Sequence, residues 1–386
     1  MGNTKYDSAS LKQMTELKAV VHDPAYEIVP IVGGGEGFYD PQVFWDWSDD
    51  GSKTIWGAEE GSILISDIGG QAQPETDWTM GHGAIFRLRP DNSWETIMAP
   101  GDGRQAGVFR PTIAPDGWGE WGGHIFFCSQ TIPHRAGAVV EHMVYRIGPG
   151  EKRPTGFCVA PKSGTVGGGL SGALLPGVFG RPGTREEGLF LIFSMHNCTI
   201  YAVRPDRSIE PWLVMDGKSA PGPVMAYRLF YADPELVGEE NVLVVEGKWN
   251  SNFNGEQSHV FEPRHYRVAD GTIHPEAIES LAGGAGLRAP AAFGKFGGQS
   301  FRPENAGFIS SVHWTEGDAE PLPYTTSIMR RDADGNEHLF VSNVQAGQNL
   351  IAFTGNRMIV SNMGHSYSSG NFKYPDGTVF MVRPKQ

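Results

Sequence analysis

Short apolar segments recur along the chain, each followed by a turn and a second short segment. The plainest copies pair an apolar strand carrying a basic residue with a Pro-Asp centre, as in GAIFRLRPDNSWETI from Gly83 and CTIYAVRPDRSIEPWLV from Cys198. Pro, Asp and Gly at such centres are typical of hairpin turns. Six copies occur, with a mean spacing of about 59 residues. Their aromatic or methionine anchors are Phe86, Tyr145, Tyr201, Tyr266, Met329 and Phe380.

A second pattern lies upstream of each hairpin, as a strongly apolar run that ends in small or polar residues. The six runs are SILISDIGG, HIFFCSQT, LFLIFSMHN, VLVVEGKW, GFISSVHW and RMIVSNMGH. With a weaker strand before several of them, each repeat holds about four short strands, the content of one propeller blade. A blade cannot bury both of its faces alone, and radial repetition covers them. The pattern predicts an all-β fold, a six-bladed β-propeller of four-stranded blades. It forms a single domain over residues 1–386 with an N-terminal tail over about 1–22.

The two ends of the chain are expected to meet in one blade. The last copy stops at Gln386 after its third strand. The run Tyr26–Val32 has a strand-like pattern and precedes the first inner strand. We predict that it supplies the missing outer strand and so closes the ring. A sandwich of two sheets would have no reason to show six copies.

Composition agrees with this architecture and limits the partners. The 52 Gly and 27 Pro suit a fold with many tight turns, and only 19% of residues are charged. The net charge of -13 disfavours nucleic acid and anionic membrane surfaces. No apolar stretch approaches the ~20 residues of a membrane span. Three cysteines without a C-x-x-C pair favour a reducing, cytoplasmic setting. The sequence does not decide whether a leader was removed or what the oligomeric state is.

Polar residues follow the apolar strands and indicate where chemistry is placed. In a propeller, such strand ends come together at the mouth of a central channel. Three imidazoles, His196, His313 and His365, lie two or three residues past the polar end of their strands. Neutral imidazole is the commonest transition-metal ligand. The spacing favours a divalent metal held by these three; a histidine-lined channel without metal and unconnected surface histidines stay open as alternatives.

Two carboxylates and one long loop complete the candidate site. Asp67 and Glu246 follow apolar strands, where an unpaired carboxylate would be costly to bury, and Lys248 lies beside Glu246. We expect Glu246, Asp67 and Lys248 to be catalytic. The polar stretch after Lys248 predicts substrate contacts, and so do one Asn of the last copy and three further histidines. The predicted substrate-binding residues are Trp249, Asn250, Asn362, His82, His134 and His259.

Other motifs have structural interpretations. The runs Gly33–Gly35 and Gly167–Gly169 lack the helix and Lys of a phosphate loop, so no nucleotide cofactor is expected. Trp56, Trp118 and Trp121 are expected to pack between blades, and Cys128 and Cys198 to be buried core thiols.

Several segments resemble the gluconolactonase/regucalcin and strictosidine-synthase-like superfamily. They are YDPQVFWDWSDDGSKTIW from Tyr39, the ILISD run ending at Asp67, the IFRLRPDN hairpin and the six-blade pattern itself. The resemblance implies a six-bladed propeller, often a lactone or ester hydrolase, with one divalent cation, frequently calcium, at the channel. The three histidines are more similar to the metal centres of propeller lyases and oxygenases.

The sequence therefore predicts a metal-dependent enzyme acting on a small organic molecule, with lactone or ester hydrolysis first. A lyase or oxidative reaction at a histidine-bound transition metal is the alternative. A propeller that binds a ligand or protein without catalysis is a third possibility, because fold does not determine function.

Overall fold

The computed structural model describes the chain as short strands and one 3-10 turn, η1 (Gly119–Trp121). The described residues are 19–32, 41–45, 63–67, 83–89, 91, 93–99, 108–129, 143–160, 174–194, 199–214, 224–231, 238–249, 264–269, 271–277, 289–292, 294–296, 299–301, 307–313, 325–331, 336–345, 349–354, 357–362 and 377–386. They are all-β, as predicted. Within them, no helix has the length and hydrophobicity needed to span a membrane.

The strands belong to two compact units. Unit 1 comprises Met1–Trp45, Ile63–Pro74 and Gly283–Gln386, and unit 2 comprises Asp46–Ser62 and Glu75–Ala282. The prediction of one domain over the whole chain stays a prediction.

Unit 2 contains three four-stranded antiparallel sheets in which strands adjacent in sequence are adjacent in space. The first is β7 (Val108–Ile113), β8 (Ile125–Ser129), β9 (Met143–Ile147) and β10 (Thr155–Val159). The second is β11 (Leu174–Phe179), β12 (Phe190–Ser194), β13 (Thr199–Val203) and β14 (Ile209–Val214). The third is β15 (Val224–Tyr231), β16 (Leu243–Trp249), β17 (Arg264–Ala269) and β18 (Thr272–Ala277). A hairpin of β5 (Ala84–Leu88) and β6 (Trp94–Met98) also lies in this unit.

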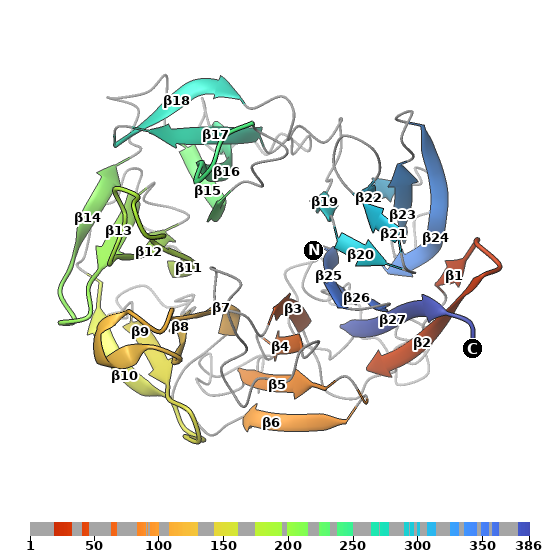
Figure 1. Ribbon diagram of the computed structural model, residues 1–386, viewed down its shortest axis with the longest axis horizontal. Coiled ribbons are helices and arrows are strands. Elements are labelled where there is room, and N and C mark those ends of the chain that lie inside the picture. The colour runs from red at the N-terminus through yellow and green to blue at the C-terminus, as the bar shows by residue number, and fades with distance from the viewer. Residues whose placement is uncertain are drawn as a thin grey trace, which may run out of the picture. The chain divides into compact units, whose positions relative to one another are not determined.

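The sheets of unit 2 stand side by side, each with its first strand next to the following sheet. Strand β11 adjoins β7 and β8 on one side and β15 on the other (Figure 1). This up-and-down order with neighbouring first strands is the arrangement expected of propeller blades.

Unit 1 has the same organisation. One four-stranded sheet has the order β2-β27-β26-β25, from β2 (Tyr26–Val32), β25 (Asn349–Thr354), β26 (Arg357–Asn362) and β27 (Thr378–Pro384). A five-stranded sheet has the order β1-β24-β23-β22-β19, from β1 (Val20–Val21), β19 (Ala289–Ala292), β22 (Gly307–His313), β23 (Thr325–Arg331) and β24 (Glu337–Gln345). Two short pairs, β3 (Pro41–Trp45) with β4 (Ile63–Asp67) and β20 (Gly294–Phe296) with β21 (Gln299–Phe301), complete the unit. Strand β25 adjoins both β3 and β19.

Five hairpins of the sequence repeat form as predicted, and the third strand of the sixth copy, β27, pairs with β2 instead. The anchor residues of the six copies lie on β5, β9, β13, β17, β23 and β27, each of which pairs with a neighbouring strand. The same kind of hydrogen bond stabilises two of the turns. The backbone N–H of Ser93 donates to Asp91 Oδ1 at 2.8 Å, and the backbone N–H of Ser208 donates to Asp206 Oδ1 at 2.9 Å. Hydrogen bonds from the side chain and then the backbone of Ser93 hold the pKa of Asp91 below its usual value, and those of Ser208 do the same for Asp206. The repeated Pro-Asp centre is therefore a repeated turn structure.

An aromatic cluster fills the space between the first two sheets of unit 2. Trp118 makes ring contacts with Phe126 and Phe157 of one sheet and with Phe179 and Phe190 of the other. Its Nε1–H donates to the carbonyl of Gly188 at 3.0 Å, so the polar edge of the ring is satisfied as well. Trp121 packs in the same cluster, so the prediction that these two tryptophans pack between blades is confirmed. Cys128 is also buried there, as predicted. Trp56 and Cys198 lie outside the described residues.

The N-terminal strand completes the last sheet of unit 1. β2 pairs antiparallel with β27 from Tyr26 opposite Pro384 to Val32 opposite Val379. This is the outer-strand pairing expected from the sequence; closure of a full ring stays a prediction. The short strand β1, which pairs with β24, lies inside the segment that the sequence suggested is a tail.

Replacing Trp118 by Ala should cost unit 2 about 3–5 kcal/mol of unfolding free energy, because a buried ring would leave a cavity between two sheets. The check is chemical denaturation followed by far-UV circular dichroism. Trp212, a half-buried residue on β14, provides the matched control, and W212A should cost no more than about 1 kcal/mol. Equal losses for the two variants would contradict the assigned core.

Deleting residues 1–32 should lower the melting temperature strongly and promote aggregation, because β27 would become an open edge strand. Deleting only residues 1–18 keeps β1 and β2 and should leave the melting temperature unchanged. Differential scanning fluorimetry and light scattering measure both effects. A 33–386 chain as stable as the full chain would show that the β2–β27 pairing contributes nothing.

Candidate functional site

Polar residues stand at the last position of the second strand in sheet after sheet. In unit 1, β4, β22 and β26 end at Asp67, His313 and Asn362. In unit 2, β8 and β12 end at Ser129 and Ser194. These strands turn polar over their last residues, since Ser66, Ser311 and Ser361 already lie inside them. In the third sheet of unit 2, the second strand β16 ends instead at Trp249.

Asp67 is the one predicted site residue whose side chain the structure describes. It is 3% exposed and lies opposite Pro41 at the start of β3. A buried carboxylate needs compensating contacts, and Asp67 is not isolated. Ser66 beside it is fully buried. The end of β4 is therefore polar although it is closed to solvent.

Within unit 1, the ends of β22 and β26 lie on the same side of two packed sheets. Arg330 near the far end of β23 lies 3.8 Å from Asp23, and Phe340 on β24 makes an edge-on ring contact with Tyr26 beside the far end of β27. The first residues of β23 and β27 therefore lie on the opposite side of the two packed sheets. At that side His313 pairs with Thr325, and Asn362 pairs with Thr378.

Buried hydroxyls gather at the same strand positions. Ser361 and Thr378 are at most 2% exposed, and Thr199 is 4% exposed at the start of β13, opposite Ser194. β13, β23 and β27 all begin with Thr. The sequence reasoning missed these threonines, although CTIYAV, TTSIMRR and GTVFMV show them at one place in the repeat.

The remaining predicted residues are placed by backbone alone or lie outside the described residues. Glu246 pairs with Arg228 and His265 inside β16, which continues through Lys248 to Trp249. Candidates outside the described residues are His82, His134, His196, Asn250, His259 and His365.

Among the residues with described side chains, no three His, Cys, Asp or Glu form a group that could hold a metal. The three predicted histidine ligands are not among those side chains, since only the backbone of His313 is placed. The metal site therefore stays a prediction. The donor types at the strand ends, imidazole, carboxylate and amide, fit a divalent cation.

The described thiols are poor nucleophiles. Burial raises the pKa of Cys158 to about 12, and burial also raises the pKa of Cys128 well above its usual value. With a pKa of about 12, roughly one Cys158 thiol in ten thousand is ionised at pH 8. Covalent catalysis through these two cysteines is disfavoured.

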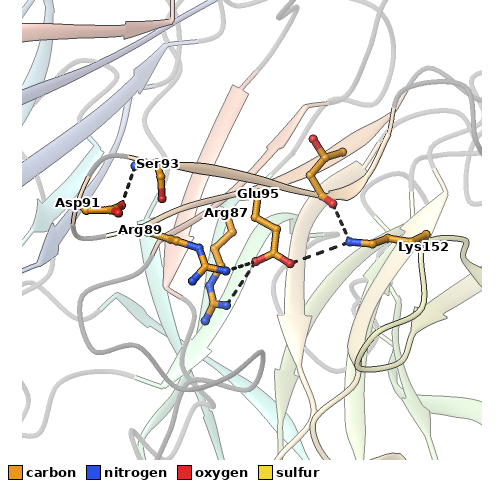
Figure 2. A network of polar contacts seen from close by, with 7 residues as sticks. Arg87, Arg89, Asp91, Ser93, Glu95 and Lys152 are labelled. Atoms are coloured by element: carbon orange, nitrogen blue, oxygen red, sulfur yellow. Dashed lines mark hydrogen bonds and ion pairs between the residues drawn. The ribbon is translucent and has the colours of Figure 1, made fainter.

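A charged network on the β5–β6 hairpin serves structure rather than chemistry. Arg87, Arg89 and Lys152 converge on Glu95, with nitrogen–oxygen distances of 3.6, 2.7 and 4.0 Å (Figure 2). Lys152, from the β9–β10 turn, also donates to the carbonyl of Thr96 at 3.0 Å. Arg87 is only 1% exposed, so Glu95 supplies charge compensation to a buried cation. The network also links two neighbouring hairpins of unit 2.

No protein-family model matches the chain, and no curated protein matches it. The search of solved structures finds matches of low identity over nearly the whole chain. A gluconolactonase from Xanthomonas campestris is 12% identical with a TM-score of 0.44, covering 96% of each chain. A catalytically inactive virginiamycin B lyase from Staphylococcus aureus, solved with quinupristin, is 12% identical with a TM-score of 0.47, covering 93% of this chain and 100% of that one. An α-L-arabinofuranosidase from Fusarium graminearum is 12% identical with a TM-score of 0.47, covering 94% of each chain.

At this identity and TM-score these similarities carry no argument about the superfamily or the reaction of this chain. The choice of a function therefore depends on the residues of this chain.

Replacing Glu95 by Gln should lower the unfolding free energy by about 1–3 kcal/mol, because it removes the carboxylate beside buried Arg87. The repeat offers a matched control in Glu210, which bonds Arg204 at 2.7 Å and is 56% exposed. In the hairpin that contains Glu210, Ala202 occupies the position that corresponds to Arg87. E210Q should therefore cost less than about 0.5 kcal/mol. Urea denaturation of both variants distinguishes them, and equal costs would refute the structural role of Glu95.

Proposed function

We propose that the chain forms one closed six-bladed propeller and hydrolyses a lactone or ester of a small organic molecule with the help of a divalent metal. The observation that supports this most is the recurrence of polar residues at the ends of second strands, with Asp67, His313 and Asn362 in unit 1. In a closed ring these ends surround one channel mouth. Hydrolysis is chosen because the segments from Tyr39 and around ILISD resemble the gluconolactonase superfamily.

In this proposal His196, His313 and His365 hold the metal. Three imidazoles leave coordination positions open, as catalytic sites require. When bound, the metal supplies Lewis-acid chemistry: it polarises a carbonyl and lowers the pKa of a bound water.

The chain's own residues bind the substrate and move the proton. Asp67 or Glu246 accepts a proton from the attacking water as general base. Lys248 offers a positive charge to the oxygen on which negative charge develops. Trp249, Asn250 and Asn362 contact the substrate, and so do His82, His134 and His259.

The metal assignment is tested on purified protein by elemental analysis and a lactonase assay. The wild type should contain about one divalent metal per chain. The H196A/H313A double variant should lose that metal and at least about 100-fold in kcat/KM. His274, an exposed residue on β18, serves as control, and H274A should keep both metal and activity.

Full metal occupancy in the double variant would contradict the histidine ligands. A wild type with stoichiometric calcium that is retained in the double variant would point to oxygen ligands instead. A metal-bound wild type without activity on lactones or esters would contradict the proposed reaction.

A further inference from the structure

We infer that Thr378 is a ligand-binding residue of this site, with its hydroxyl directed at an oxygen of the bound substrate. The inference rests on the proposed function and names a residue that the sequence reasoning did not. Thr378 is 2% exposed, and its Oγ1 has no hydrogen-bond partner among the described residues, whereas most buried polar atoms in folded proteins have one. Among the described side chains, Ser66 Oγ beside Asp67 is also buried without a hydrogen-bond partner.

The strand register places Thr378 beside the candidate residues. It is the first residue of β27 and lies opposite Asn362, the last residue of β26. Side chains alternate along a strand, so Thr378 shares a face with Phe380 and Val382. Both of these pack in the apolar cluster between this sheet and that of β22–β24. Thr378 therefore stands at the edge of the cluster, on the side where β22 ends at His313.

The fold itself does not require an unsatisfied hydroxyl at this position. Thr199 occupies the same place in the repeat, as the first residue of β13 opposite Ser194, and is also buried at 4% exposure. Unlike Thr378, it has an interaction partner within the protein. A valine would fill the space at Thr378 without burying a polar atom. In the free protein the unsatisfied hydroxyl lowers the stability, and a ligand that forms a hydrogen bond with it would remove that loss.

The chemistry of a hydroxyl limits the ligand. It donates one hydrogen bond and accepts others, so it suits a ligand with carbonyl or hydroxyl oxygens. A hydroxylated lactone and the hydroxy acid formed from it both carry such groups. The site would thus prefer oxygen-rich substrates over apolar esters of the same size.

Three variants test the inference, with glucono-1,5-lactone as the probe. T378V removes the hydroxyl, T378S keeps it, and T199V is the matched control. In the absence of ligand, T378V should melt at the wild-type temperature or roughly 2 °C above it, whereas T199V should melt below the wild type. In the hydrolysis assay, T378V should raise KM roughly tenfold, and T378S should stay within about threefold of the wild type.

The inference is overturned if T378V melts several degrees below the wild type, because the hydroxyl would then be bonded inside the protein. An unchanged KM for T378V, with the wild type active, overturns it as well and leaves the proposed function intact. No hydrolysis by the wild type would contradict the proposed function, and with it the assignment of a lactone to Thr378.

Discussion

Each sheet of this protein has two faces, and both must be covered by another sheet. The chain has no helices within its described residues to cover them, so stability depends on the apolar packing between successive sheets. The Trp118 cluster in unit 2 and the cluster around Phe380 in unit 1 are two instances of the same interaction. Because the sheets are held face to face, their first strands are brought next to one another. The positions of the strand ends follow from this packing.

The candidate site is a consequence of where the apolar packing stops. A strand is mainly apolar while it lies between two sheets, and polar residues such as Ser361 and Asn362 occur near its end. Asp67, His313 and Asn362 occupy the last position of their strands. Thr378 lies just inside the same boundary and keeps an unsatisfied hydroxyl there. A buried hydroxyl without a hydrogen-bond partner reduces stability, a cost that natural proteins accept at functional sites.

Much of the fold could be predicted from the sequence because the repeat carries its own turn chemistry. The Pro-Asp and Asp-Gly turn residues located hairpins, and the pattern of Tyr26–Val32 identified the strand that pairs with β27. The two-residue strand β1 was missed, because two valines carry no periodicity. The strand containing Glu246 runs on to Trp249, since the long partner β15 pairs with it over that whole length.

The site could be predicted only in part. Residue type and strand position pointed to Asp67 and His313, but Thr378 carried no chemical signal, because threonine is common in strands. The proposed role of Thr378 rests on its burial and on the lack of a hydrogen-bond partner among the described residues. The histidine ligands depend on long-range arrangement between repeats, which no local pattern determines.

The most direct test of the account is a crystal structure of the metal-loaded protein with anomalous data collected at the absorption edge of the bound metal. The account predicts one anomalous peak at the ends of the second strands, about 2.0–2.1 Å from ring nitrogens of His196, His313 and His365. A map in which these histidines lie apart, or in which the metal is held by other residues, would contradict it.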